Sequence, residues 1–167
     1  MSHKISLASL LTAFVLAGCG GGGSPPPAAP SASTAGATQD AVSRIGDVSI
    51  RASVVQTSSL PEQVAAQYGI ARDDRTVMLL VAVRQGPEAQ EVALPAQITA
   101  TATDLRGRRQ TVSMRELRTG AGSGPELLDY IGTVDISLPD TLRFDLTIVR
   151  EGGATSSMQF SRDFYPR

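Results

Sequence analysis

Cys19, the only cysteine of the 167-residue chain, is the reactive side chain with the most distinctive surroundings. It follows a short basic start, MSHK, and an apolar run from Ile5 to Ala17, and it precedes a tract rich in glycine and proline. A basic start and an apolar run of this length are typical of a secretory signal, and the run is too short to span a bilayer. Cys19 is therefore a thiol that directly follows a predicted secretory signal, where covalent modification would decide where the protein is held.

The residues before Cys19 indicate which modification to expect. Leu16-Ala17-Gly18-Cys19 resembles the lipobox of bacterial lipoproteins, in which the signal is cut before the cysteine and a diacylglycerol is attached to the sulfur. Buried acyl chains hold a protein at the bilayer, so the resemblance implies a membrane anchor. By resemblance to lipoprotein sorting, Gly20 in the next position favours the outer membrane, facing the periplasm. The alternative is an ordinary signal peptide in which the cysteine is incidental.

The segment after Cys19 is predicted to be a linker. From Gly20 to Gln39 it contains only Gly, Ser, Pro, Ala, Thr and Gln, so it has no charge and no side chain large enough to build a core. About 20 residues of such coil reach roughly 25 Å, which keeps a folded domain close to its membrane. We therefore expect three parts, which are the signal peptide at 1–18, the lipidated cysteine with its linker at 19–43, and one folded domain at 44–167.

Composition excludes several classes of enzyme from the folded domain. The only histidine and the only lysine, His3 and Lys4, belong to the predicted signal, and Cys19 is expected to carry lipid. These absences exclude a Ser-His or Cys-His nucleophile, a Schiff-base lysine and a His or Cys zinc site within one chain, and they exclude a disulfide. Asp73 and Asp74 lack a third oxygen ligand at the spacing of a calcium loop. We therefore expect no catalytic residue, no cofactor and no metal.

The charged and aromatic residues give candidates for a contact surface. The 15 basic and 16 acidic residues nearly balance, so no net field steers nucleic acid toward the chain. Arg106, Arg108 and Arg109 cluster at a predicted hairpin tip, where their guanidinium groups could grip the phosphates of lipid headgroups or an acidic partner. The alternative is a solvated turn that discourages edge pairing. Tyr68 and Tyr165 form a second candidate contact, with a small satellite core as the alternative.

The predicted domain alternates apolar and polar residues as β-strands do. Thr76 to Arg84, TVMLLVAVR, is apolar on both faces, which is typical of a central strand. Seven strands at about ten-residue spacing predict an all-β fold with one short helix, an immunoglobulin-like antiparallel β-sandwich, with a small β-barrel as the alternative. The other six predicted strands are DVSIRASVVQ, QITATATD, RQTVSMREL, LLDYIGTVDI, LRFDLTIVR and SSMQFSRDF.

Local signals place the helix and two turns. SSLPEQVAAQYGI predicts a short helix in which Ser59 and Glu62 have capping-box spacing and Gly69 ends the helix. LRGRR predicts a hairpin that leads into RQTVSMREL, which is expected to be one strand. LPDTLRF resembles the corner before strand F of immunoglobulin-like domains, with Phe144 where those domains often carry tyrosine.

The order of several segments resembles that of a known family. LPEQVAAQYGI followed by ARDDRTVMLLVAV, then TATDLRG, DYIGTVD, LRFDLTI and FSRDFYP, resembles the uncharacterised periplasmic family catalogued as domain of unknown function forty-four twenty-six (DUF4426), over about Ile45 to Arg167. Members of that family are small secreted proteins, mostly with a plain cleavable signal. The resemblance implies a periplasmic compartment and no particular activity. The lipobox and the linker depart from the family pattern.

These observations favour a membrane-tethered periplasmic lipoprotein without enzymatic activity, which binds an unknown envelope protein through its loops or an exposed strand edge. Two alternatives stay open. One is a domain that binds a small lipid or glycan between the sheets, which requires an apolar pocket of several hundred cubic ångströms there. The other is a hydrolase that uses carboxylates alone, which needs two acids facing each other across a cleft.

Overall fold

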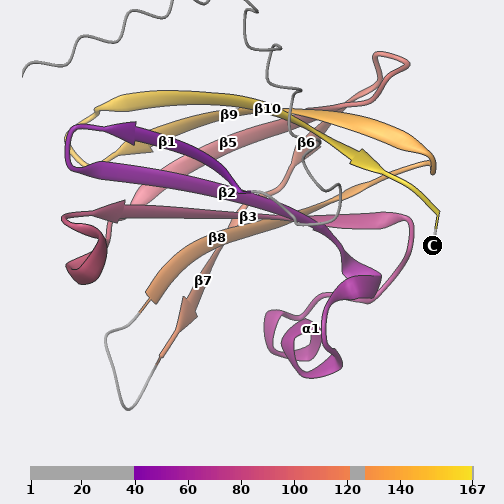
Figure 1. Ribbon diagram of the computed structural model, residues 1–167, viewed down its shortest axis with the longest axis horizontal. Helices are drawn as coiled ribbons and strands as arrows, with labels where there is room; N and C mark the ends of the chain where they lie inside the picture. The colour runs from indigo at the N-terminus through magenta and orange to yellow at the C-terminus, as the bar shows by residue number, and fades with distance from the viewer. Residues whose placement is uncertain (1–39, 121–126, 167) are drawn as a thin grey trace, which may run out of the picture. The chain divides into compact units, whose positions relative to one another are not determined.

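The computed structural model describes residues 40–120 and 127–166. Cys19, the predicted signal peptide and most of the predicted linker lie outside the described residues. Within the described ranges, ten strands form two antiparallel sheets, and one α-helix and two short 3-10 helices lie in the connections between strands. The strands of the two sheets lie in two layers (Figure 1).

The strand order defines the two layers, which we name sheet A and sheet B. Sheet A has the order β1-β2-β3-β8-β7, with β4 paired to β3, and sheet B has the order β10-β9-β5-β6. The strands of sheet A are β1 (Ala41–Ile45), β2 (Val48–Gln56), β3 (Thr76–Gln85), β4 (Val92–Ala93), β7 (Arg115–Thr119) and β8 (Leu127–Asp135). The strands of sheet B are β5 (Ala96–Thr103), β6 (Arg109–Val112), β9 (Asp140–Arg150) and β10 (Thr155–Phe164).

One apolar core between the sheets confirms the predicted all-β sandwich. Alternate residues of β3 and β9 face the opposite sheet, as the two-residue period of a strand requires. Phe144 of β9 is fully buried and stacks on Phe160 of β10, with 5.3 Å between the ring centroids. The two sheets are separate in the described residues, so the alternative of a small barrel is wrong. The core residues from β3 and β9 are Val77, Leu79, Val81, Val83, Leu142, Phe144, Leu146 and Ile148.

The helix α1 (Glu62–Tyr68) is present, but the predicted capping box is wrong. The residue before the helix is Pro61, and no side chain caps the first turn. Ser59 instead belongs to the 3-10 helix η1 (Thr57–Ser59). A capping serine needs an extended backbone at the start of the helix, and the 3-10 turn removes Ser59 from that position.

Apolar contacts hold α1 against the outer face of sheet A. Gly69 ends the helix in the left-handed conformation, at φ 62°, as predicted. The N–H of Ile70 then donates to the carbonyl of Ala65 at 2.9 Å, which turns the chain back toward the sheet. The buried members of this outer cluster are Leu60, Ala65, Met78, Leu117 and Ile131.

The prediction of one strand over RQTVSMREL is wrong, because the chain changes sheets within it. β6 pairs with β5 in sheet B, whereas β7 pairs with β8 in sheet A. The crossing at Ser113 and Met114 passes directly over Gly132 of β8. A Cβ atom on Gly132 would lie 2.7 Å from Cγ1 of Val112 and 2.8 Å from the carbonyl oxygen of Ser113. The glycine therefore leaves the space through which the crossing runs.

Two strands have no counterpart in the sequence prediction, namely β1 and β4. β1 begins at Ala41, so the last residues of the predicted linker range, 19–43, are part of sheet A.

Tyr130 of β8 is buried, and its hydroxyl accepts a hydrogen bond from the N–H of Ala96 at 2.7 Å. This bond connects sheet A to the start of β5 in sheet B.

Candidate functional site

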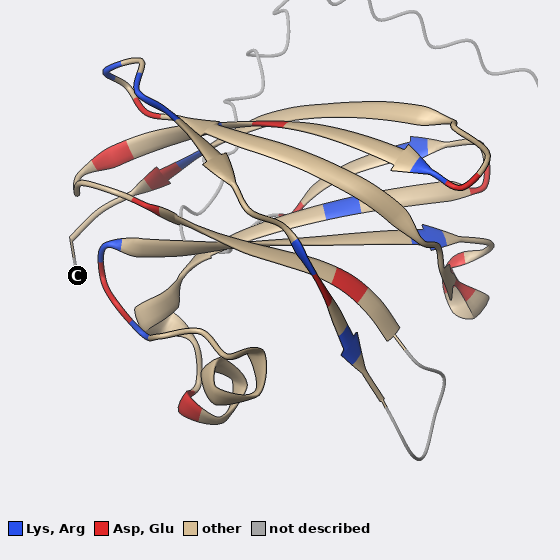
Figure 2. Ribbon diagram, turned by 180° about the vertical axis from the view of Figure 1, so that it is seen from behind, with Lys and Arg blue, Asp and Glu red and all other residues tan. Residues whose placement is uncertain are grey.

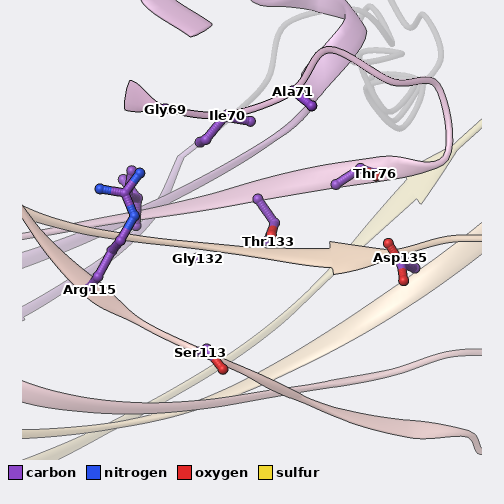
Figure 3. Close-up of a pocket in the computed structure, with 10 residues that line it drawn as sticks. Gly69, Ile70, Ala71, Thr76, Ser113, Arg115, Gly132, Thr133 and Asp135 are labelled. Carbon is purple, nitrogen blue, oxygen red and sulfur yellow. The ribbon is translucent and has the colours of Figure 1, made fainter. Parts of the chain in front are cut away.

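A cleft of about 320 Å³ lies on the outer face of sheet A. It is bounded by the loop after α1, the start of β3, the end of β8 and the crossing between β6 and β7 (Figure 3). The residues that give the cleft its chemical character are Ile70, Thr76, Ser113, Arg115, Thr133 and Asp135.

Strand register brings these residues to one face. Thr133 and Asp135 alternate with buried residues of β8 and therefore point outward. Thr76 of β3 is paired with Asp135, and Arg115 of β7 is paired with Ile131. Ile131 and Asp135 are four residues apart, which is about 13 Å along a strand. The arginine and the carboxylate therefore lie at opposite ends of the cleft, with Thr133 between them (Figure 3).

The end of α1 orients Arg115. Nη2 of Arg115 donates a hydrogen bond to the carbonyl of Tyr68, the last residue of the helix. Carbonyls at a helix C-terminus have no partner within the helix and carry partial negative charge, so they attract a guanidinium group. A guanidinium group has five N–H donors, and the remaining donors are available to a ligand in the cleft.

Asp135 provides the opposite charge. Its backbone carbonyl accepts a hydrogen bond from the side chain of Gln110 at 2.9 Å. Among the described residues, no hydrogen bond or ion pair engages its exposed carboxylate. A ligand carboxylate can bind the guanidinium of Arg115 through two parallel hydrogen bonds, while the carboxylate of Asp135 accepts from an amino group or a hydroxyl. The arrangement suits reversible binding of a short polar chain.

The predicted arginine cluster lies on the β5–β6 hairpin and does not line the cleft. Arg106, Arg108 and Arg109 are exposed. Nε of Arg108 pairs with Oδ2 of Asp104 at 3.0 Å. Burial raises the pKa of Asp104, but hydrogen bonds from the Arg108 side chain and from the N–H groups of Arg108 and Arg106 outweigh it, so the pKa lies below its ordinary value. The three arginines lie on a turn closed by hydrogen bonds to Asp104, and their contact with a partner stays a prediction.

Tyr68 and Tyr165 have different surroundings. Tyr68 is half-buried and packs against the outer cluster beneath α1, as in the satellite-core alternative. Tyr165 follows the end of β10, and 66% of its surface is exposed. A joint contact patch formed by the two tyrosines stays a prediction.

Two groups of ion pairs on sheet A were missed by sequence reasoning. Arg51 of β2 binds Glu91 through both terminal nitrogens at 2.9 Å, and Ser49 donates to the same carboxylate at 3.0 Å. The hydrogen bond from Arg51 lowers the pKa of Glu91 and outweighs the opposite effect of burial. Arg84, which is 8% exposed, pairs with Asp129. Because each of these charges has a partner, we assign both groups to stability of the fold.

No metal centre or membrane-spanning helix is found in the described ranges. These residues contain no group of three or more His, Cys, Asp or Glu side chains that could hold a metal ion. No helix among them is long enough and apolar enough to cross a membrane.

Comparison with known proteins relates both the sequence and the fold to one family. The family model described as Domain of unknown function (DUF4426) matches residues 42–167. A DUF4426 family protein from Pseudomonas aeruginosa PAO1 has a similar structure, with a TM-score of 0.62 and 21% identity over 77% of this chain and 96% of that chain. FetP from uropathogenic E. coli strain F11 matches with a TM-score of 0.45 and 11% identity, over 74% of this chain and 91% of that chain. No curated protein matches the sequence.

Proposed function

The chain belongs to the DUF4426 family, and from that premise we propose that it is a lipid-anchored module of the cell envelope that binds a partner protein and catalyses no reaction. Its anchor is Cys19, and its place is the periplasmic side of the outer membrane. Its binding site is the cleft between Arg115 and Asp135. The ligand is a short polar segment of an envelope protein that carries a carboxylate.

The observation that carries this proposal is the separation of opposite charges in the cleft. Arg115 and Asp135 lie at the two ends, Thr133 lies between them, and Thr76 lies beside Asp135 on the neighbouring strand. An extended chain advances about 3.3 Å per residue, so a segment of about four residues matches the roughly 13 Å between Ile131 and Asp135 along β8. A carboxylate at one end of such a segment can then bind Arg115 while an amino or hydroxyl group at the other end binds Asp135.

A hydrolase that uses carboxylates alone is less well supported. Such an enzyme needs a pair of carboxyl groups facing each other across the substrate. Asp135 is the acidic residue among the described residues that line the cleft. The lining groups can position a ligand, but this set supplies one carboxylate where the reaction requires two.

A glycan is the second candidate ligand for the same cleft. The hydroxyls of Thr76, Ser113 and Thr133 and the carboxylate of Asp135 can exchange hydrogen bonds with sugar hydroxyls. A lipid between the sheets is less well supported, because core residues such as Leu79 and Phe144 are fully buried there. The charge of Arg115 favours the peptide, since a neutral sugar leaves the guanidinium without a counter-ion.

The test is site-specific photo-crosslinking of the full-length protein in intact cells. A crosslinker at Thr133, inside the cleft, is expected to capture one discrete protein, and the same crosslinker at Thr147, exposed on the outer face of sheet B, is not. Asp135→Asn in the Thr133 background should reduce the product by about tenfold, because a hydrogen bond to a charged group contributes ~1.5–3 kcal/mol. Asp135→Asn is preferred to a change at Arg115, which also binds the carbonyl of Tyr68.

Three outcomes decide between the candidates. A discrete protein product that depends on Asp135 supports the proposal. Equal products from Thr133 and Thr147, or a product unaffected by Asp135→Asn, would contradict it. A product from Thr133 whose added mass is removed by glycosidases, and whose proteolytic digest contains peptides of this protein alone, would contradict the peptide ligand and favour the glycan.

A further inference from the structure

The β5–β6 hairpin presents an apolar side chain at its tip. Leu105 is 75% exposed, the highest value among the exposed large apolar side chains of the described residues. It is followed in the sequence by Arg106, Arg108 and Arg109. The hairpin projects beyond the body of the sandwich, with arginine positions in blue at its tip (Figure 2). The tip is therefore an apolar residue surrounded by cations.

The side chain of Asp104 holds this tip in one conformation. Asp104 is buried, and its Oδ1 accepts hydrogen bonds from the N–H of Arg106 at 3.0 Å and the N–H of Arg108 at 2.8 Å. Gly107 has φ 81°, a left-handed conformation that glycine adopts without strain. The N–H of Gly107 closes the turn on the carbonyl of Asp104 at 3.0 Å. Leu105 is thus held outside the core by an ordered turn.

The exposed charged side chains at the tip are the three arginines, whereas the whole chain has a net charge of −1. Arg108 is paired with Asp104. Among the described residues, the guanidinium groups of Arg106 and Arg109 form no ion pair and donate no hydrogen bond. An exposed apolar residue next to unpaired cations matches a membrane interface, where acyl chains accept the apolar group and anionic phosphates accept the cations.

The geometry points to a bilayer as the partner of this hairpin. We propose that the hairpin docks on the membrane that holds the lipid anchor, with Leu105 at the level of the headgroups and Arg106 and Arg109 on anionic phosphates. The length of the chain before the domain favours a membrane as the partner. The linker predicted at Gly20 to Gln39 reaches roughly 25 Å, so the domain stays close to the membrane that holds the proposed anchor. The inference rests on the proposed anchor at Cys19, and it adds a second contact between the domain and the membrane.

Tryptophan fluorescence tests the docking, because the chain contains no tryptophan. The protein carrying Leu105→Trp is expressed from the full-length sequence, purified from the cell envelope, and mixed with vesicles of phosphatidylcholine with or without phosphatidylglycerol. Val92→Trp is the matched control, since Val92 is 67% exposed on β4. With phosphatidylglycerol present, emission from position 105 should shift to the blue and be quenched by brominated lipids. Emission from position 92 should not change.

Charge variants show whether the arginines contribute. Each arginine near an anionic surface contributes about fivefold to binding, so Arg106→Gln with Arg109→Gln should weaken the contact by about 25-fold and abolish most of the shift from position 105. Arg75→Gln, at an exposed position before β3, is the control and should leave the shift unchanged.

The results separate failure of the docking from failure of the anchor. Protein that floats with vesicles while position 105 stays unshifted would overturn the docking and leave the anchor intact. Protein that does not float would overturn the proposed anchor. A shift that is equal in the two lipid mixtures, or equal at positions 105 and 92, would also overturn the docking as we propose it.

Discussion

Replacing Gly132 with alanine is expected to destabilise the sandwich by about 2 kcal/mol. The new Cβ would lie 2.7 Å from Cγ1 of Val112, 2.8 Å from the carbonyl oxygen of Ser113 and 3.0 Å from Sδ of Met114. The oxygen belongs to the backbone between two paired strands, so it cannot move away without disturbing β6 or β7. Overpacking of this kind costs up to ~3 kcal/mol, and the better strand propensity of alanine recovers ~1 kcal/mol.

The assay is urea denaturation of the purified protein followed by far-ultraviolet circular dichroism. Ser157→Ala, at an exposed position of β10, is the control and should change the free energy of unfolding by about 0.5 kcal/mol or less. If Gly132→Ala unfolds at the same urea concentration as the parent protein, the backbone at the crossing moves aside for the new Cβ atom at little cost in free energy. The explanation of the glycine as the space for the crossing would then be refuted.

Three further predictions concern the core and the charged groups. Phe144→Ala should lower the free energy of unfolding by about 3–5 kcal/mol, because a fully buried ring is removed; a loss below ~1 kcal/mol in the same urea assay would show that Phe144 is not central to the core. Arg84→Met should cost about 3 kcal/mol by leaving Asp129 unpaired, and adding Asp129→Leu should recover most of it; no recovery in thermal denaturation would contradict this. The folded pKa of Asp104 is lowered, so its ionised form stabilises the fold above the unfolded pKa of about 3.9, and this contribution is lost as pH falls through the lower folded value. Asp104→Asn should therefore flatten the stability profile between neutral pH and about pH 3; an unchanged acid slope would argue against it.

The sequence predicted the strands that carry the core because their apolar residues have a clear period. The buried faces of β8 and β9 follow directly from alternation, whereas β3 was predicted from an apolar, β-branched run on both faces. The exchange of sheets at Ser113 could not be predicted in this way. Val112 and Met114 alternate with polar residues through the crossing itself, and the apolar phase changes only at Leu117. The residue that permits the crossing, Gly132, lies on another strand. The prediction of a capping box was wrong because the spacing of Ser59 and Glu62 does not exclude a separate 3-10 turn that contains Ser59.

The candidate cleft was not predicted because its residues have no local signature. Thr133 and Asp135 occupy outward strand positions, where polar residues are normal. Only the pairing of β8 with β3 and β7 places them beside Thr76 and Arg115. The arginine cluster, in contrast, was identified from the sequence, because its members are adjacent in the chain. The exposed Leu105 became significant only when the structure showed that the turn holds it outside the core.

The anchor on Cys19 is the central claim, because both the compartment and the docking of the hairpin depend on it. Mass spectrometry of the N-terminal fragment, taken from protein extracted from the cell envelope, tests this claim most directly. We predict a fragment that begins at Cys19 and carries a diacylglyceryl group on the sulfur. A fragment with a free thiol at Cys19, or one that begins at a different residue, would contradict the account.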